Sequence, residues 1–262
     1  MSLPIEIGES VAGLSVERAS ALHARIDASR GGRLVLGVPA GRTLVPVIEA
    51  LVEKLRAEPL PLDHIVFVLM DDYALPTDDG GWRIPSTSAH YSCRRFGEWM
   101  LAELNEAVSP LAGIPTASLW SPDPSEPESY DAAIAGIGGV DLFYVAVGAS
   151  DGHVAFNPPG TAIDSRTRII PLAESTRRDN LGTFPEFESL SDVPTHGVSV
   201  GLASIADARE IEMIAFGDNK TAAIARLRDA TDFDPAWPAT FAYRHPAVTL
   251  YVDRAAAGVA TV

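Results

Sequence analysis

A carboxylate and an imidazole follow the most apolar segment of the chain, at a spacing that suits acid–base chemistry. Residues 140–147 are mostly β-branched or aromatic, and Asp151 and His153 come shortly after this run ends at Gly148. Such a run is typical of a buried parallel strand, and α/β sheets bind ligands just beyond the carboxyl ends of these strands. Gly152 lets the backbone turn between the two side chains. The alternative is an ordinary strand-end turn with an incidental His.

The motif Met70-Asp71-Asp72-Tyr73 places adjacent carboxyl groups directly after a second apolar run, residues 65–69. A partly buried carboxyl group has a raised pKa and can serve as a general base near neutral pH. A divalent-metal site is a rival interpretation, but no His or third carboxylate lies nearby in the sequence, so we expect no metal. A helix-capping Asp with a solvated neighbour is the third interpretation. We favour catalysis, because this loop should lie beside the other strand ends.

The loop 37–43 leads from a predicted strand into a predicted helix. Gly41 frees the backbone, Arg42 adds a cation and Thr43 supplies a hydroxyl. The unpaired N–H groups and partial positive charge of a helix N-terminus suit a phosphate group. The loop matches neither the Walker pattern nor the dinucleotide fingerprint, so a plain turn with a Thr cap is the alternative.

The net charge of the chain limits the kinds of molecule that it is expected to bind. The 262 residues carry a formal net charge of −15, which disfavours nucleic acid and anionic membrane surfaces. An anionic ligand must therefore meet locally placed cations, and we expect Arg177 and Lys220 to act as phosphate clamps. Surface ion pairs with nearby Asp and Glu are the alternative for each.

The number of cysteines and the lengths of the apolar segments indicate the cellular compartment of the protein. Cys93 is the single cysteine, which rules out an internal disulfide framework and suggests a reducing environment. We interpret Cys93 as structural. No apolar run approaches the length of a membrane span, and the start lacks the pattern of a signal peptide. We therefore expect a cytoplasmic protein.

Strand-like and helix-like segments alternate along the chain, which predicts parallel strands joined by right-handed helical crossovers. We predict an α/β fold, a doubly wound, mostly parallel, Rossmann-like sheet with helices on both faces, as one domain over residues 1–262. The expected strands are 34–38, 65–69, 118–120, the run from 142, 197–202, 211–216 and 248–252, and the expected helices are 17–26, 44–55, 89–104, 128–137 and 220–227.

Taken together, the loops resemble the glucosamine-6-phosphate deaminase (isomerase) family, which is related in fold and motifs to the 6-phosphogluconolactonases. The resemblance runs from about residue 33 to about residue 253. It rests on the order of the motifs, which are the loop at Gly41, Met70-Asp71-Asp72-Tyr73, Asp151-Gly152-His153 with Ala155-Phe156-Asn157, Ser165-Arg166-Thr167-Arg168-Ile169, and Gly217 with Lys220.

The resemblance implies a three-layer fold, a phosphorylated sugar as substrate and no cofactor. Asp71 would move a proton between C2 and C1, and His153, oriented by Asp151, would assist ring opening. It further implies a set of residues that bind the substrate or its phosphate: Ala40, Gly41, Arg42, Thr43, Asp72, Gly152, Arg177 and Lys220.

The chain also departs from this family. Pro158 stands where the deaminases carry a Glu beside the ring-opening His, and Arg42 replaces the second glycine of the phosphate loop. Three interpretations stay open: a deaminase acting on an amino-sugar phosphate, a 6-phosphogluconolactonase-type hydrolase that uses His153 as the base for water, and a non-catalytic phosphosugar sensor. Whether the chain forms a homo-oligomer is open as well.

Overall fold

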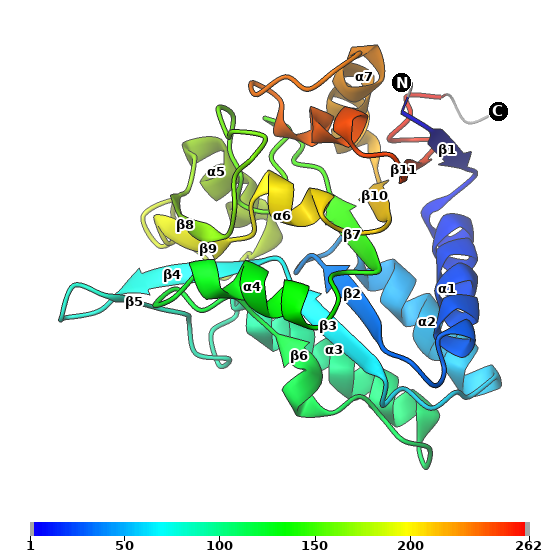
Figure 1. Cartoon of the computed structure of the whole chain (residues 1–262). Coiled ribbons are helices and arrows are strands. Elements are labelled where there is room, and N and C mark those ends of the chain that lie inside the picture. Colours follow the sequence, from blue (N-terminus) through cyan, green and yellow to red (C-terminus); the bar gives the residue numbers. More distant parts are fainter. Residues whose placement is uncertain (1–2, 260–262) are drawn as a thin grey trace.

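Seven parallel strands form the centre of the protein in the computed structural model, which describes residues 3–259 (Figure 1). Every neighbouring pair is parallel, as the alternating pattern of strands and helices predicts. In spatial order the strands are β1 (Ile5–Gly8), β11 (Val248–Asp253), β10 (Ile211–Ala215), β7 (Leu142–Ala146), β2 (Leu34–Val38), β3 (Ile65–Leu69) and β6 (Leu119–Trp120).

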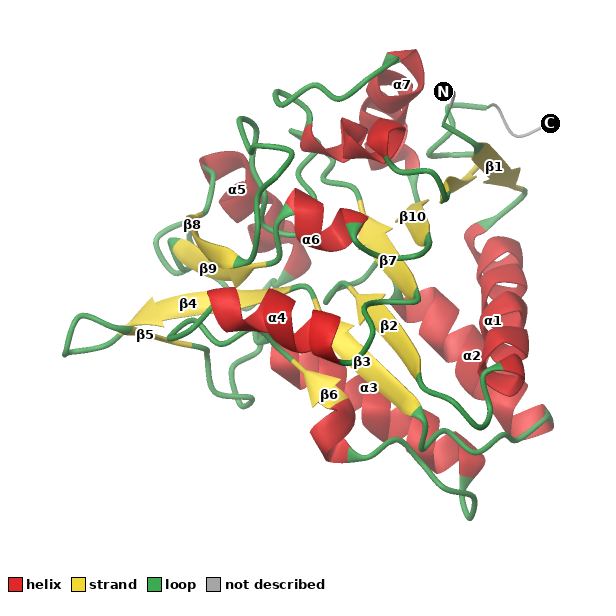
Figure 2. Ribbon diagram, in the orientation of Figure 1, coloured by secondary structure: helices red, strands yellow, loops and turns green. Residues whose placement is uncertain are grey.

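Helices cover both faces of this sheet (Figure 2). On β2, Leu34 and Leu36 belong to one buried cluster and Val35 to the other, because successive side chains of a strand point to opposite faces. The first cluster includes residues of α1 (Val11–Ala28), α2 (Val45–Ala57) and α3 (Cys93–Val108). The second includes residues of α4 (Glu128–Gly136), α6 (Leu202–Ala206), α7 (Thr221–Asp229) and the 3₁₀ helix η3 (Pro238–Arg244).

A second, antiparallel sheet lies beside the first and was not expected from the sequence. Its four strands are, in order, β5 (Trp82–Arg83), β4 (Asp71–Pro76), β9 (His196–Ser199) and β8 (Arg168–Pro171). Only Met70 separates β3 from β4, so the chain passes from one sheet to the other at this residue. The helix α5 (Glu174–Thr183) follows β8, and short 3₁₀ turns form at η1 (Thr116–Ser118) and η2 (Asp218–Lys220).

Several element boundaries differ from the prediction for local reasons. The helix expected from residue 89 begins at Cys93, because Ser92 caps it by accepting a hydrogen bond from the Arg95 N–H. The strand expected over 197–202 ends at Ser199, and α6 begins at Leu202. None of the helices in the described part of the chain has the length and apolar character needed to cross a membrane.

The order of the strands reverses direction between β2 and β7. The chain continues from β2 to β3 and β6 on one side, and from β7 to β10 and β11 on the other. In open α/β sheets, ligands bind at such a switch point, outside the carboxyl ends of the strands. The loops that follow β2 and β7 are the predicted phosphate loop and the loop of Asp151 and His153.

Candidate active site

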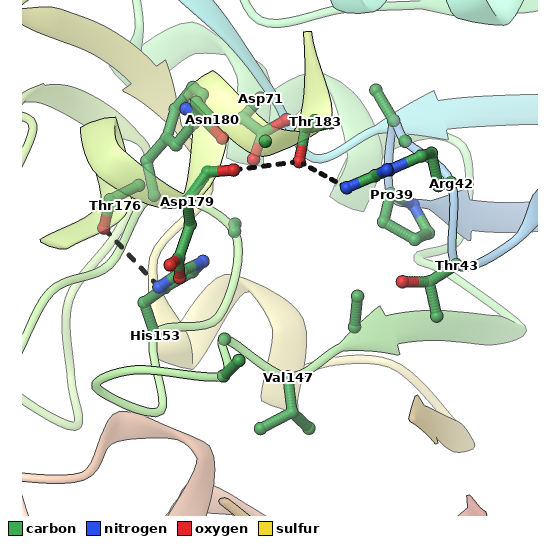
Figure 3. A pocket seen from close by; sticks show the side chains of 18 of the residues that line it. Pro39, Arg42, Thr43, Asp71, Val147, His153, Thr176, Asp179, Asn180 and Thr183 are labelled. Atoms are coloured by element: carbon green, nitrogen blue, oxygen red, sulfur yellow. Dashed lines mark hydrogen bonds between the residues drawn. The ribbon is translucent and has the colours of Figure 1, made fainter. Parts of the chain in front are cut away.

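A cavity of about 710 Å³ opens at this switch point, between the central sheet, the second sheet and α5 (Figure 3). Figure 3 shows the side chains of Asp71, His153 and Arg42 entering it from separate elements. The predicted site residues that line the cavity are Ala40, Gly41, Arg42, Thr43, Asp71, His153 and Lys220.

Asp71 is the first residue of β4 rather than part of a loop, and its side chain faces the cavity. The residue is 6% exposed. Burial, together with the charge of adjacent Asp72, raises the pKa of Asp71 to about 7, and a hydrogen bond from the Cys93 thiol opposes that rise. A carboxyl group with this pKa can exchange a proton readily near neutral pH.

Asp72 points to the other side of β4 and does not line the cavity. It is fully buried and accepts backbone hydrogen bonds from Tyr73, Cys93 and Arg94 at 2.8–3.1 Å. Burial raises the pKa of Asp72 to about 6, even though these N–H groups stabilise its charged form. Through these bonds Asp72 anchors the first turn of α3, as in the capping interpretation of the sequence, and its contact with substrate stays a prediction.

His153 and Asp151 form a hydrogen-bonded pair on the loop after β7. Nδ1 of His153 lies 2.6 Å from Oδ1 of Asp151, which leaves Nε2 as the nitrogen available to a ligand. Burial disfavours the Asp151 charge, but hydrogen bonds from His153 and Ser175 outweigh that effect and lower the pKa of Asp151 to about 2. Gly148 permits this ring position, because a Cβ there would lie 2.3 Å from Nδ1.

Another part of the cavity is suited to an anion. The Lys220 ammonium group donates to the Val147 carbonyl at 2.7 Å, and burial lowers its pKa. Gly41 has a φ of +135°, and the following helix α2 begins at Val45 with no side-chain cap. Uncapped N–H groups at a helix N-terminus attract phosphate and other anions.

Two predicted ligands of the substrate lie elsewhere. Arg177, on α5, is not in the cavity lining; its guanidinium donates to the carbonyls of Leu190 and Val193. Its role as a phosphate clamp stays a prediction. Gly152 is also outside the lining and packs against the indole of Trp237. Its φ of +66° shapes the loop of His153, and its contact with a ligand stays a prediction.

Sequence reasoning missed the contribution of α5. Thr176, Asp179 and Asn180 line the cavity from this helix. The Asp179 carboxylate accepts a hydrogen bond of 2.6 Å from Ser150 and acts electrostatically on Lys220, whereas the Asn180 Nδ2 atom is buried without a partner in the described structure. Thr176 is the one buried residue of α5, so no apolar stripe signals the helix.

Within residues 3–259, no group of three or more His, Cys, Asp or Glu side chains could hold a metal ion. The titratable and charged groups of the cavity lining include the carboxyl groups of Asp71 and Asp179, the imidazole of His153, the ammonium group of Lys220 and the guanidinium groups of Arg42 and Arg178.

The fold and this cavity define a class of protein: a three-layer α/β protein with a cavity lined by carboxyl, imidazole and ammonium groups at the carboxyl edge of its central sheet. No family model matches the chain. It is 30% identical to a glucosamine-6-phosphate deaminase of Shouchella clausii over 95% of this chain and 94% of that protein. It is 37% identical to one of Pseudarthrobacter chlorophenolicus, over 85% of this chain and 80% of that protein. The chain therefore belongs to the glucosamine-6-phosphate deaminase family.

Solved structures show the same fold. A monomeric glucosamine-6-phosphate deaminase of the NagB superfamily superposes with a TM-score of 0.81 at 24% identity, covering 98% of this chain and 100% of that one. A 6-phosphogluconolactonase from Leishmania guyanensis superposes with a TM-score of 0.70 at 19% identity, and the match covers both chains completely. At these identities the likeness establishes the architecture alone.

Proposed function

We propose that this chain is a glucosamine-6-phosphate deaminase. It opens the ring of the amino-sugar phosphate, moves a proton from C2 to C1, and lets water hydrolyse the resulting imine, which yields fructose 6-phosphate and ammonia. The observation that carries the proposal is the shared cavity of Asp71 and His153, in which burial holds the pKa of the Asp71 carboxyl group at about 7.

The cavity offers a suitable side chain for each step of the proposed reaction. His153, held by Asp151, exchanges a proton with the ring oxygen during opening. Asp71 removes the proton from C2 and returns it to C1, which requires a carboxylate that is neither a strong nor a very weak base. Lys220 and the N–H groups of the loop at Gly41 bind the phosphate group.

Pro158 does not remove the acid–base partner of the imidazole. It is absent from the cavity lining, and its carbonyl accepts hydrogen bonds from Thr161. Asp151 already orients His153 from within the same loop. This supports ring opening without a titratable group at position 158.

A lactonase is the second candidate. The His153–Asp151 pair would be sufficient to activate water against a lactone carbonyl, and lactonases share the fold. The lactonase reaction leaves the buried Asp71 without a role, which is why we favour the deaminase. The single cysteine fits a cytoplasmic enzyme of sugar-phosphate metabolism.

The test is a pair of assays on the purified protein. Ammonia release from glucosamine 6-phosphate, coupled to the appearance of fructose 6-phosphate, is the expected result. Acid release from 6-phosphogluconolactone without ammonia release would establish the lactonase instead. Tight binding of both phosphosugars with no turnover would identify a sensor and overturn the proposal.

A further inference from the structure

Tyr73 faces the same cavity as Asp71 and has no assigned role. The two residues are separated by one position on β4, so their side chains share a face of the strand while Asp72 points away. Both belong to the cavity lining. The alternation of side chains along β4 therefore places the phenol of Tyr73 on the same face as the carboxyl group of Asp71, the proposed base.

The ring of Tyr73 is held firmly in place. It is 1% exposed and contacts Tyr91, Phe156 and Phe184 with ring centroids 5.2, 5.2 and 6.4 Å away. These aromatic contacts fix the position of the hydroxyl without hydrogen bonding to it.

The hydroxyl group itself lacks a partner. The Oη atom is buried and forms no hydrogen bond within the described residues. Buried hydroxyl groups nearly always have a partner, so one without a partner in a residue of the cavity lining points to a ligand. Burial and the nearby Cys93 and Asp71 raise the pKa of Tyr73 above its ordinary value. The phenol therefore stays protonated and acts as a donor.

The proposed reaction needs such a donor. When Asp71 takes the proton from C2 of the open-chain sugar, the C–H electron pair forms a C1–C2 double bond, and negative charge moves to the oxygen on C1. A preorganised donor aimed at that oxygen lowers the barrier. The oxygen then takes a proton from the ammonium group on C2, and as Asp71 returns its proton to C1 the nitrogen lone pair forms the C2=N double bond of the iminium ion.

Most other donors of the cavity have a partner or a proposed role; Nδ2 of Asn180 has neither, but it comes from α5 and not from the strand of Asp71. Lys220 donates to the Val147 carbonyl, and the Cys93 thiol donates to Asp71 itself. His153 is bound through Nδ1 to Asp151. We propose that Tyr73 is a catalytic residue whose hydroxyl donates a hydrogen bond to the C1 oxygen as charge develops there. This inference rests on the proposed deaminase function.

The decisive variant is Tyr73→Phe, which removes the hydroxyl and keeps the ring packing. Tyr91→Phe is the matched control, because Tyr91 belongs to the same aromatic cluster but does not line the cavity. We expect Tyr73→Phe to lower kcat about 100-fold with KM within about twofold, as for the loss of one oxyanion donor. The control should retain wild-type kinetics.

Two ligands that the enzyme cannot convert distinguish a catalytic role of Tyr73 from a structural one. A phosphorylated aldonohydroxamate mimics the planar, charged intermediate, whereas glucitol 6-phosphate has saturated carbons at C1 and C2. Tyr73→Phe should weaken hydroxamate binding by the same factor as kcat and leave glucitol 6-phosphate binding unchanged, as measured by calorimetry. Equal weakening of both ligands, or a kcat within twofold of wild type, would overturn the role of Tyr73. A wild-type protein that releases no ammonia would refute the proposed function itself, and this inference with it.

Discussion

The Cys93 thiol donates a hydrogen bond to the Asp71 carboxylate, with Sγ 3.5 Å from Oδ1. The contact joins the first residue of α3 to the first residue of β4, and both side chains are buried. It stabilises the charged form of Asp71 and so opposes the effect of burial on the pKa of this carboxyl group. The single cysteine therefore adjusts the proposed base, although the sequence suggested only a structural residue.

Removal of this thiol should move the pH dependence of catalysis. In Cys93→Ala the pKa of Asp71 rises further, and the acidic limb of the kcat profile should shift upward by about one pH unit. Activity then falls strongly at pH 6 and changes little at pH 8.5. Cys93→Ser retains a donor at nearly the same place and should keep a profile close to wild type. Superimposable profiles for the Ala and Ser variants would show that the thiol does not influence Asp71.

Substitution of Asp71 should remove catalysis without changing the binding of ligands. Asp71→Asn preserves the size of the side chain but cannot accept the proton from C2. We expect ammonia release to fall at least about 1,000-fold, because general-base catalysis is lost, while glucitol 6-phosphate binds as before. A lactonase would tolerate the same change. Retained deaminase turnover in this variant would disprove the assigned role.

The sequence was sufficient to locate the strand ends that form the site. β2, β3 and β7 are apolar runs that are almost completely buried, and such runs are recognisable without a structure. Parallel strands share one carboxyl edge, so the loops at Gly41 and His153 could be expected to meet. The doubly wound sheet follows from the same alternation of segments.

The strands of the second, antiparallel sheet could not be recognised from apolar runs in the sequence. β8 contains Arg168 and Pro171 in four residues, and β4 begins with two acidic residues, so neither resembles a buried strand. Once β4 is known to be a strand, the opposite directions of Asp71 and Asp72 follow from its two-residue period. The placement of Arg177 depends on how α5 packs, and α5 lacks an apolar stripe that would predict it.

Substitutions of Lys220 and Arg177 should have different effects on phosphate binding and on stability. Lys220→Ala removes the ammonium group from the cavity and should weaken inorganic phosphate binding about 10- to 100-fold. Arg177→Ala should leave phosphate binding unchanged and destabilise the fold by about 1–3 kcal/mol, because its carbonyl partners at Leu190 and Val193 lose their donor. Calorimetric titration and thermal unfolding measure the two effects. The reverse pattern would identify Arg177, and not Lys220, as the phosphate ligand.

Asp179 places a negative charge in the cavity near Lys220. This charge should weaken the binding of a dianion, so Asp179→Asn is expected to bind inorganic phosphate about three- to tenfold more tightly at low salt, with a smaller gain at high salt. Glu186→Gln is the control, because Glu186 is exposed and lies outside the cavity lining. Weaker phosphate binding by Asp179→Asn would mean that the carboxylate organises the site instead of opposing the anion.

A buried acid far from the cavity lining should make stability depend on pH. Glu212 on β10 is 4% exposed and lies 3.4 Å from Arg18 of α1, yet its Oε2 atom has no hydrogen-bond partner among residues 3–259. Burial outweighs the attraction of Arg18 and raises the pKa of Glu212 to about 7 from 4.5. The folded protein therefore binds this proton more tightly than the unfolded chain does.

The sign of the effect follows from linkage. Below pH 4.5 both states are protonated at Glu212, and its contribution to stability is fully present. As pH rises through about 7, the folded protein also loses the proton, and that stability is lost. Glu212→Gln mimics the protonated form, so it should match wild type at pH 4 and exceed it by about 2 kcal/mol at pH 8. Urea unfolding at the two pH values measures the difference, and a variant less stable than wild type at pH 8 would show that the ion pair with Arg18 outweighs burial.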